Sequence, residues 1–484
     1  MARHDLSVSR RGFASGALSL ALGTAARELR AEPPSEALRA ASATALGELA
    51  RHATKLGMRL SACVADAASG QVLAEAASHD VQNPASNQKL LTMAVALDRL
   101  GPNHRFTTAL LGRASGDGNL SELVLRSNGD PELSTATLEQ LVRGLVDQGV
   151  RRINGDVWVD QSAFDSNWDP PAYELHPDEW AAYRAPVSAV SVNGNSVTLH
   201  VLGVENSVAR SWLTPPGVAS LSGEVLTGAA QSPQNVRYSV RPRGDELEVL
   251  VGGSVPSGRG ELTFTRRIAQ PELAPGRVLA LLLREHGVSV AGQLRAGGAD
   301  VQAERVSQRS RSLAEIIHAL GKHSDNFVAE MLLKALGASD KSGPGSSAKG
   351  ARLIEEYLNR VGGLDSGTRI GNGSGLYDAN RVSAFGIVRA LVATFNDVRL
   401  APEFIAALSI GGLDGTLSQR FKTHRAERSV RAKTGTLADA TALSGYLLRG
   451  RTALAFSLVV NGVAGKQLDA RARIDAAIET ILRA

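Results

Sequence analysis

Cysteine, lysine and aromatic residues are all scarce in this chain of 484 residues. The single cysteine, Cys63, excludes a disulfide within the chain. Only nine lysines accompany 44 arginines, and aromatic residues make up 4% of the sequence. The arginines are scattered and are not interleaved with aromatic side chains, which argues against a surface for nucleic acid. Because lysine is so scarce, a lysine within a chemical motif carries more weight here than in a lysine-rich protein.

Long apolar runs are missing as well, since a membrane span takes about 20 apolar residues. The run from Ala14 to Ala26 is shorter, and it follows the twin-arginine pattern Ser9-Arg10-Arg11-Gly12-Phe13. Together they predict a twin-arginine signal peptide over residues 1–31, with cleavage after Ala31. We therefore expect export to the periplasm, with no transmembrane anchor after signal removal. An amphipathic N-terminal helix is the alternative interpretation.

The length and composition predict a globular protein of two or three domains. The chain is too long for one ordinary core, and 43% apolar and 21% charged residues are usual for a folded protein. Residues 104 to 305 are rich in short strand-like runs and contain no lysine, whereas helices alternate with strands on both sides of them. The pattern predicts a multi-domain α/β protein in which one discontinuous α/β domain carries a mostly β insertion.

The flanking regions give the most regular patterns. Cys63 belongs to an alternating apolar run and is expected to be a small core residue. The predicted helices are 36–55, 312–320, 326–337, 348–360 and 467–483. The predicted strands are 59–67, 71–77, 429–436, 440–448 and 452–460.

Ser86 opens a further predicted helix, and Lys89 follows one turn later on the same helix face. Serine needs a base to take its proton, and a desolvated lysine has a lowered pKa that suits this task. The N–H groups at the start of the helix favour developing negative charge. The pair therefore predicts a nucleophile with its base. The same S-x-x-K spacing recurs from Ser346 to Lys349 after a Gly/Pro loop, which we interpret as chance.

The tripeptide Ser324-Asp325-Asn326 lies between two predicted helices. The Ser324 hydroxyl could relay a proton to a leaving amine, and the Asn326 amide could bind a substrate carbonyl while contacting Lys89. Taken alone, the tripeptide is better explained as an ordinary helix N-cap, for which serine and aspartate are favoured.

Lys433-Thr434-Gly435-Thr436 precedes the alternating run from Ala440 to Leu448. On a strand, Lys433 would offer a cation to a substrate carboxylate, and the two threonine hydroxyls would form hydrogen bonds. Gly435 would let a substrate backbone approach, and the Thr436 N–H could complete an oxyanion site with that of Ser86. The alternative is a surface lysine beside a turn.

The three motifs occur in the order S-x-x-K, S-x-N, K-T-G, the set found in class A β-lactamases and penicillin-binding proteins. The chain resembles the class C low-molecular-mass penicillin-binding proteins, the D-Ala-D-Ala carboxypeptidase/endopeptidases of peptidase family S13. That family carries two extra domains between its first two motifs, which suits the long gap between Ser86 and Ser324. Further matching stretches are Asn83–Ser86, Ser127–Pro131, Ala185–Ala189, Asn193–Asn195, Asp414–Leu417 and Ala442–Tyr446.

The resemblance implies a fold with three parts. A penicillin-binding/β-lactamase-like transpeptidase domain, an antiparallel sheet flanked by helices, is expected at 35–103 and 306–484. A first inserted, mostly β domain is expected at 104–199 and 262–305. A second inserted domain is expected to be nested within the first at 200–261.

The resemblance also implies the chemistry. Ser86 is expected to be acylated by the penultimate D-Ala carbonyl, with Lys89 as its base, and water is expected to release the product without a metal or another cofactor. The expected catalytic residues are Ser86, Lys89, Ser324, Asn326 and Lys433. The expected substrate-binding residues are Thr434, Gly435, Thr436, Tyr183 and Trp180, although aromatic packing explains the last two equally well.

The partners implied by the resemblance are peptidoglycan stem peptides and inhibitory β-lactams. The balance of carboxypeptidase and endopeptidase action and the oligomeric state stay open. One alternative is a catalytically weak protein that binds peptidoglycan or β-lactams. Another is a β-lactamase or esterase, although the Glu-containing loop of class A β-lactamases is missing. Where the family usually has D-G-S-G-L-S, this chain has Asn372-Gly373-Ser374-Gly375-Leu376-Tyr377.

Overall fold

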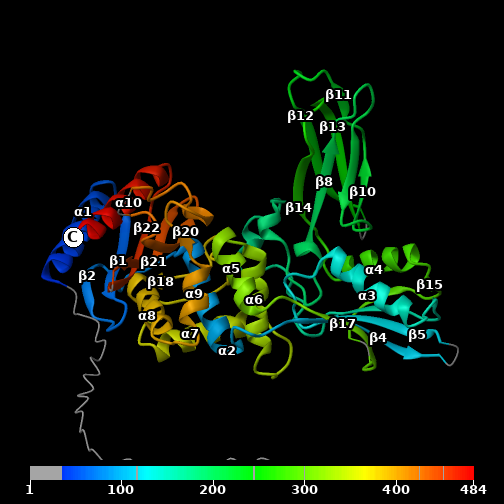
Figure 1. Ribbon diagram of the computed structural model, residues 1–484, viewed down its shortest axis with the longest axis horizontal. Coiled ribbons are helices and arrows are strands. Elements are labelled where there is room, and N and C mark those ends of the chain that lie inside the picture. Colours follow the sequence, from blue (N-terminus) through cyan, green and yellow to red (C-terminus); the bar gives the residue numbers. More distant parts are fainter. Residues whose placement is uncertain (1–34, 116–117, 244–245, 299, 424–425, 451) are drawn as a thin grey trace, which may run out of the picture.

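The computed structural model describes residues 35–115, 118–243, 246–298, 300–423, 426–450 and 452–484. The predicted signal peptide over residues 1–31 lies outside these residues. The molecule is elongated, with a helix-covered sheet at one end, a second sheet at the other end, and a narrow β-structure that projects to one side (Figure 1). None of the helices within the described ranges is long and apolar enough to cross a membrane.

A six-stranded antiparallel sheet forms the core of the first end. The pairing of its fourth and fifth strands joins the two ends of the sequence, because Arg59 lies opposite Asn461 and Asp66 lies opposite Leu454. The strands, in spatial order, are β19 (Ser409–Ile410), β20 (Val430–Thr436), β21 (Ala440–Arg449), β22 (Thr452–Asn461), β1 (Arg59–Asp66) and β2 (Val72–Ala76).

Helices cover both faces of this sheet, because the side chains of each strand point alternately to its two sides. Leu443 and Leu447 pack on one side with α1 (Glu36–Lys55) and α10 (Gln467–Arg483). Ala442 and Tyr446 face the other helices. The latter are α2 (Gln88–Leu100), α5 (Leu313–His323), α6 (Asn326–Ala338), α7 (Ser347–Arg360), α8 (Ala384–Phe395) and α9 (Ala401–Ala407).

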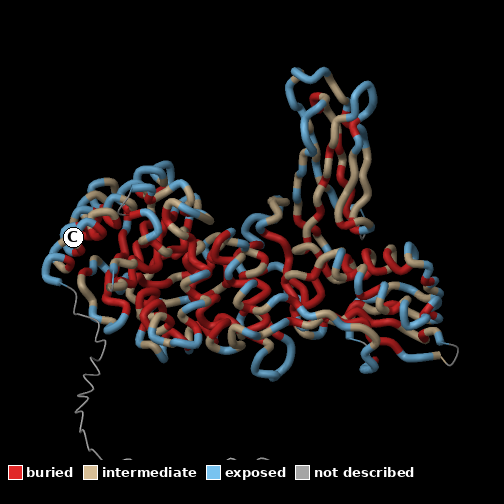
Figure 2. The backbone as a smooth tube through the Cα atoms, in the orientation of Figure 1, coloured by how far each residue is buried: buried red, intermediate tan, exposed pale blue. Residues whose placement is uncertain are grey.

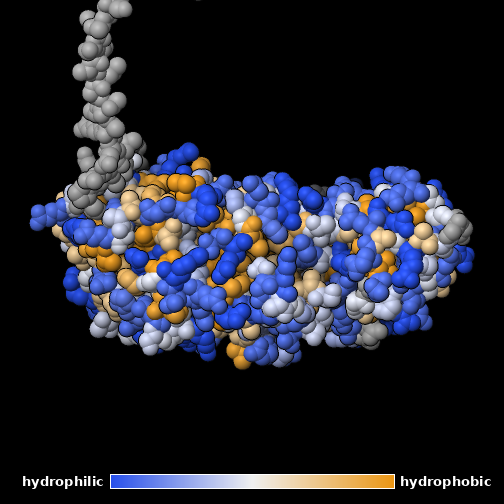
Figure 3. All heavy atoms as spheres, turned by 90° about the horizontal axis from the view of Figure 1, so that it is seen from below, coloured by the Kyte–Doolittle hydropathy of each residue, from blue (hydrophilic) through white to orange (hydrophobic). Residues whose placement is uncertain are grey.

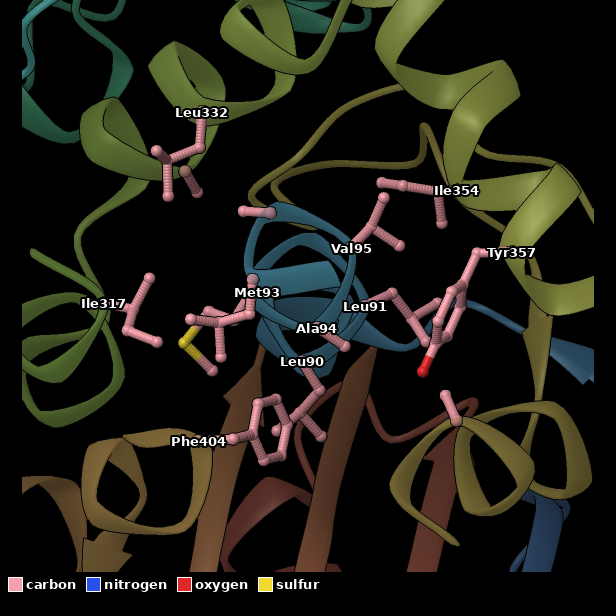
Figure 4. Close-up of a cluster of buried hydrophobic side chains, with 14 of the residues drawn as sticks. Leu90, Leu91, Met93, Ala94, Val95, Ile317, Leu332, Ile354, Tyr357 and Phe404 are labelled. Atoms are coloured by element: carbon pink, nitrogen blue, oxygen red, sulfur yellow. The ribbon is translucent and has the colours of Figure 1, made fainter. Parts of the chain in front are cut away.

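Helix α2 is buried on all sides. Every residue from Gln88 to Leu97 is buried, and side chains from α5, α6, α7 and α9 surround the helix (Figure 4). Fully burying one large apolar side chain contributes about 1.5–3 kcal/mol, so this packing holds the helix and its N-terminus firmly. Cys63 on β1 belongs to the same core and is a free, fully buried thiol.

The second end is a seven-stranded sheet built from the inserted residues. It mixes antiparallel and parallel pairs, and two helices, α3 (Thr135–Asp147) and α4 (Ala274–Glu285), pack into one core with it. The strands are β4 (Thr107–Ala114), β5 (Leu120–Ser127), β6 (Arg152–Ile153), β7 (Val157–Asp160), β15 (Ser289–Val290), β16 (Leu294–Ala296) and β17 (Glu304–Arg309). The insertion is mostly β, as predicted, but these two helices were not predicted.

Strands β8 to β14 form the narrow projection, which we call the pillar (residues 196–267). Buried residues occupy only a thin strip along its length, whereas the two ends of the molecule have wide cores (Figure 2). Its three-stranded sheet contains β14 (Leu262–Arg267), β8 (Ser196–Leu202) and β9 (Arg210–Thr214). Its four-stranded sheet contains β10 (Ala219–Ser222), β11 (Leu226–Gly228), β12 (Asn235–Arg243) and β13 (Glu246–Pro256).

Two of the predicted domain edges fall inside strands. The edge at 199/200 divides β8, and the edge at 305/306 divides β17. The division into three domains remains a proposal, and its edges belong a few residues away from these positions. On the face of the molecule drawn in Figure 3, apolar side chains form small patches among hydrophilic ones.

Candidate active site

Ser86 lies in the 3-10 turn η1 (Ala85–Asn87), directly before α2. Ala85 has a φ of 48°, a left-handed conformation that costs free energy for a residue with a Cβ. Two buried side chains hold the turn in this shape. Asn83 Oδ1 accepts the Ala85 N–H at 2.9 Å, and Asn87 Nδ2 donates to Ser444 Oγ at 2.6 Å. The serine is therefore presented by a strained turn that is fixed to its surroundings.

The Lys89 amine meets three oxygen atoms one turn further along the chain. Its Nζ lies 3.1 Å from Ser86 Oγ, 2.7 Å from Asn326 Oδ1 and 2.7 Å from the Ser374 carbonyl oxygen. The side chain is fully buried. The structure thus brings the predicted serine, lysine and asparagine together at one point.

Burial lowers the pKa of Lys89 to about 7, against the opposite influence of the negative charges of Glu330 and Asp325. A large fraction of the amine is therefore neutral near pH 7. A neutral amine has two N–H groups and one lone pair. Asn326 Oδ1 and the Ser374 carbonyl can only accept hydrogen bonds, so they take the two N–H groups. The lone pair then faces the Ser86 hydroxyl, as a general base requires.

The inserted region fixes the orientation of the Asn326 amide. Asn326 Nδ2 donates to the backbone carbonyl of Tyr183, in the 3-10 turn η3 (Ala182–Arg184), at 3.0 Å. Because the amide nitrogen points to a carbonyl, the amide oxygen must point to Lys89. A flipped amide would place an N–H donor against the lysine, so the Tyr183 carbonyl keeps an acceptor there.

Ser324 and Asp325 have different positions in the joint between α5 and α6. Ser324 ends α5 in a left-handed conformation with a φ of 60°. Asp325 is the N-cap of α6 and accepts the Val328 N–H at 3.1 Å. The capping interpretation is therefore right for Asp325 alone. Within the described residues the Ser324 hydroxyl has no hydrogen-bond partner, so it is not engaged in a cap.

Lys433 lies on β20 and is fully buried, with Nζ donating to the Thr434 carbonyl at 2.9 Å. It is not a surface lysine. No carboxylate of the described residues pairs with it within 4.0 Å. Burial, and then the positive charge of Lys89, lower the pKa of Lys433 well below its usual range. An anionic ligand would restore the charged form, which suits this amine to a substrate carboxylate.

Gly435 makes the close approach of β20 to the serine turn possible. A Cβ at this position would lie 3.0 Å from both Ala85 Cβ and the Pro84 carbonyl oxygen, and 3.2 Å from the Ser86 nitrogen. That this glycine makes room for a substrate backbone stays a prediction, and the structure shows a second reason for a glycine here. In the structure it makes room for the turn that carries the serine.

The two threonines of the motif lie near the open end of β20. Thr434 Oγ1 donates to Thr416 Oγ1 at 2.8 Å, which ties the strand to the turn η5 (Gly415–Leu417). Thr436 is exposed. β19 pairs only with Arg431 and Ala432, so the described strands leave this edge of β20 open at Thr436.

The two aromatic candidates occupy different surroundings. The Tyr183 side chain is 49% exposed, beside the backbone carbonyl that binds Asn326. The Trp180 ring lies 4.7 Å from the Arg267 guanidinium and packs against the core of the inserted sheet. These surroundings favour the packing interpretation for Trp180.

The departure from the family pattern at Asn372 has a structural role. Its Nδ2 donates to the carbonyls of Pro171 and Leu376, at 3.1 and 3.0 Å, and its Oδ1 accepts from the Gly375 N–H at 2.9 Å. An aspartate could not make the two donated bonds. The asparagine therefore fits this site in its own right.

Tyr377 joins the same loop to the inserted region. Its hydroxyl donates to the Glu179 carboxylate, and its ring stacks on His176 with 4.3 Å between ring centroids. The sequence analysis predicted neither Glu179 as the acceptor nor His176 as the stacking partner.

The second S-x-x-K stretch plays no part in this cluster. In the second S-x-x-K stretch, Ser346 is the N-cap of α7 and accepts the Lys349 N–H at 3.1 Å, as the chance interpretation requires. The described residues contain no group of three or more histidine, cysteine, aspartate or glutamate side chains placed to hold a metal ion.

Comparison with known proteins gives consistent matches along most of the chain. The D-Ala-D-Ala carboxypeptidase 3 (S13) family matches residues 43–483. A D-alanyl-D-alanine carboxypeptidase of Actinomadura sp. (strain R39) is 33% identical over 432 residues, which cover 83% of this chain and 77% of the relative. The D-alanyl-D-alanine carboxypeptidase DacB of Haemophilus influenzae is 24% identical over 412 residues, covering 83% and 85%.

A solved structure shares the fold. The crystal structure of penicillin binding protein 4 (dacB) from Haemophilus influenzae has a TM-score of 0.75 at 22% identity, covering 90% of this chain and 97% of that chain. A second crystal structure of that protein, in complex with a β-lactam, has a TM-score of 0.71 at 22% identity and covers 90% and 98%.

Proposed function

The chain belongs to the D-Ala-D-Ala carboxypeptidase 3 (S13) family, and we propose that it hydrolyses peptidoglycan stem peptides with Ser86 as its nucleophile. The observation that carries this proposal is the set of contacts around Lys89. Two pure acceptors take both N–H groups of the neutral amine, so its lone pair is left for the serine hydroxyl.

The reaction proceeds in two stages. The Ser86 proton moves to Lys89 Nζ while Oγ attacks the penultimate D-Ala carbonyl carbon, and the peptide C–N bond then breaks. The proton that Lys89 took from Ser86 then passes through the Ser324 hydroxyl to the nitrogen of the departing D-Ala. A water molecule hydrolyses the resulting ester and frees the shortened peptide. The oxyanion lies between the N–H groups of Ser86 and Thr436.

The same site accounts for substrate choice. A peptide that ends in D-Ala carries a terminal carboxylate, and Lys433 is a buried amine without an anionic partner among the described residues. The open edge of β20 offers backbone groups to an extended peptide, with Thr434 and Thr436 hydroxyls beside them. Asn326 binds a substrate amide, and the exposed Tyr183 ring lies on the rim. A β-lactam mimics the peptide and acylates Ser86.

The location and domain arrangement follow from this function. Peptidoglycan lies outside the cytoplasmic membrane, so we take residues 1–31 as the twin-arginine signal that delivers the protein to the periplasm. We propose that the transpeptidase-like domain spans about residues 35–103 and 306–484, the first inserted domain about residues 104–199 and 262–305, and the nested domain about residues 200–261, with the edges moved by a few residues so that none divides β8 or β17.

Covalent labelling tests the nucleophile. We expect a fluorescent penicillin to label the purified protein and a peptide ending in D-Ala-D-Ala to lose its last residue. Ser86→Ala should abolish both, whereas Ser346→Ala, in the second S-x-x-K stretch, should keep both. Labelling that persists in Ser86→Ala would refute the assignment. Labelling without any peptide turnover would identify a binding protein, and many turnovers of a chromogenic cephalosporin per molecule would identify a β-lactamase.

A further inference from the structure

Glu330 is a buried carboxylate beside the active site. The reaction proposed above assigns it no role. It lies on α6, one turn after Asn326, and its side chain is 1% exposed. Lys334 follows after another turn, so the three polar side chains lie along one face of the helix. Asn326 contacts Lys89, and Lys334 pairs with Asp165 of the inserted region at 2.7 Å. Glu330 lies between these two contacts.

Both oxygens of Glu330 bind the loop that carries the departure from the family pattern. Oε1 accepts the Ser374 N–H at 2.8 Å, and Oε2 accepts the Gly373 N–H at 3.0 Å. From the other side, Thr92 Oγ1 donates to the Gly373 carbonyl at 2.8 Å. The next carbonyl, that of Ser374, receives Lys89 Nζ. The carboxylate therefore fixes the short segment whose carbonyl takes one N–H of the amine.

Burial raises the pKa of Glu330 above its usual range, although hydrogen bonds from the Ser374 side chain and from the Gly373 and Ser374 amides, and the charge of Lys89, act in the opposite direction. Each oxygen already accepts a backbone N–H, an arrangement that favours a carboxylate over a carboxylic acid. These bonds offset the cost of burying the charge, so we assign Glu330 to its charged form.

We propose that Glu330 is a positioning residue for acylation. It holds the Gly373–Ser374 backbone so that the Ser374 carbonyl accepts one N–H of Lys89, and the lone pair of the amine then points to Ser86. Without this hold, the carbonyl could turn away and the free N–H of Lys89 could turn toward the serine. The amine would then donate to the hydroxyl when it should accept from it. This inference rests on the proposed roles of Ser86 and Lys89.

The negative charge of Glu330 gives the proposal a distinctive signature. It raises the pKa of Lys89, so its removal should lower that pKa further. The neutral base would then persist to lower pH. In a variant that lacks the charge, the acidic limb of the pH–rate profile should therefore move to lower pH, and the loss of the loop contacts should slow acylation. A purely structural residue would change the rate or the stability without moving that limb.

The test compares four variants by their second-order rate of acylation by a fluorescent penicillin between pH 5 and pH 9, with rates normalised to the labelled fraction. Glu330→Gln should lower the rate by about ten- to a hundredfold and shift the limb downward. Glu330→Asp keeps the charge but is shorter, so it should lower the rate and leave the limb in place. Thr92→Val loosens the loop from its other side without a change of charge, and should give a smaller loss with an unmoved limb.

Lys334→Met is the matched control, because it removes a buried charge from the same face of α6 away from Lys89. It should lower the melting temperature and leave the limb and the normalised rate unchanged. A Glu330→Gln protein with the wild-type rate and limb would overturn the inference. So would a slower rate in Glu330→Gln with an unmoved limb, because the loss of a purely structural contact would give the same result. Labelling of Ser86→Ala would instead contradict the proposed function. The two results above concern Glu330→Gln, so failure of the inference and failure of the proposed function can be told apart.

Discussion

The active-site end of the molecule and the pillar are built in opposite ways. Around Ser86, α2 is buried on all sides, and Lys89, Glu330 and Lys433 lie inside with hydrogen-bond partners on the protein. The pillar has only a thin core, and every residue of its strand β12 is exposed or half-buried. Groups that must hold a reacting atom within a fraction of an ångström need a rigid surrounding. The comparison teaches that substitutions of similar size should have very different effects in the two regions.

The largest effect is expected from removal of the base. Lys89→Met should lower the rate of acylation by on the order of a thousandfold, because the proton of Ser86 loses its acceptor. The melting temperature should stay the same or rise, since a buried amine is replaced by an apolar chain of similar length. Penicillin labelling and thermal unfolding of the same preparation check both parts. A rate within a few fold of the wild type would contradict the role of this lysine.

A pair of glycine substitutions sharpens the comparison of the two regions. Gly435→Ala should lower acylation by about ten- to a hundredfold, because its Cβ would push β20 away from the turn of Ser86. Gly252→Ala, on β13 of the pillar, adds a methyl group with no heavy atom within 4 Å. It should leave acylation unchanged. Equal losses in the two variants would mean that the fit around Ser86 is not tighter than that in the pillar.

Replacing Asn372 by the residue usual in the family should destabilise this protein. Asn372→Asp loses two donated hydrogen bonds and places a charge against two carbonyls, at a cost of about 1–3 kcal/mol or more. We expect a lower melting temperature and a several-fold slower acylation. Improved stability in this variant would contradict the bonding assigned to the asparagine.

The acidic side of the pH dependence of acylation should show the loss of neutral Lys89. Burial lowers the pKa of this amine to about 7, so the active neutral form is lost as pH falls through that value. The rate should therefore decline about tenfold for each pH unit below the midpoint. A flat profile from pH 5 to pH 8 would show that the neutral amine is not required.

The smallest effect is expected on the surface of the pillar. Arg241 pairs with Glu248 at 2.7 Å, but its side chain is largely exposed, and water and salt screen such a pair. Arg241→Ala should leave the rate of acylation unchanged and cause the smallest shift in melting temperature of the series. A clear loss of activity would indicate that the pillar is coupled to the active site.

The regular elements of the first end could be predicted because their patterns are local. The helix at 36–55 and the strands at 440–448 and 452–460 appear in the structure nearly as predicted. The α/β class and the family are confirmed by the comparisons. Ser346 as a helix cap could also be anticipated, since a cap is a contact within one turn.

Several helices were missed for identifiable reasons. The apolar residues of α3 follow a helical period, namely Leu138, Leu141, Val142 and Leu145. They lie, however, in a region whose other segments have strand-like patterns. The helix α8 (Ala384–Phe395) is buried on most sides, so its apolar run lacks the polar face that marks an amphipathic helix. Tertiary packing, not local preference, decides both of these segments.

The parts of the site that escaped prediction depend on contacts distant in sequence or made by the backbone. The carbonyls of Tyr183 and Ser374 orient the site, and nothing in a side-chain motif indicates a carbonyl. Glu330 has one weak signal, its spacing of one helical turn from Asn326. Gly435 was predicted to make room for a substrate backbone, and only the fold shows that the serine turn also lies against it.

The central claim is that the hydroxyl of Ser86, and no other serine, forms the acyl bond. The most direct measurement is peptide mapping of the penicillin-treated wild-type protein by mass spectrometry. We predict one adduct per molecule, on the peptide that contains Ser86. An adduct on the peptide of Ser324 or Ser346, with that of Ser86 unmodified, would contradict the account.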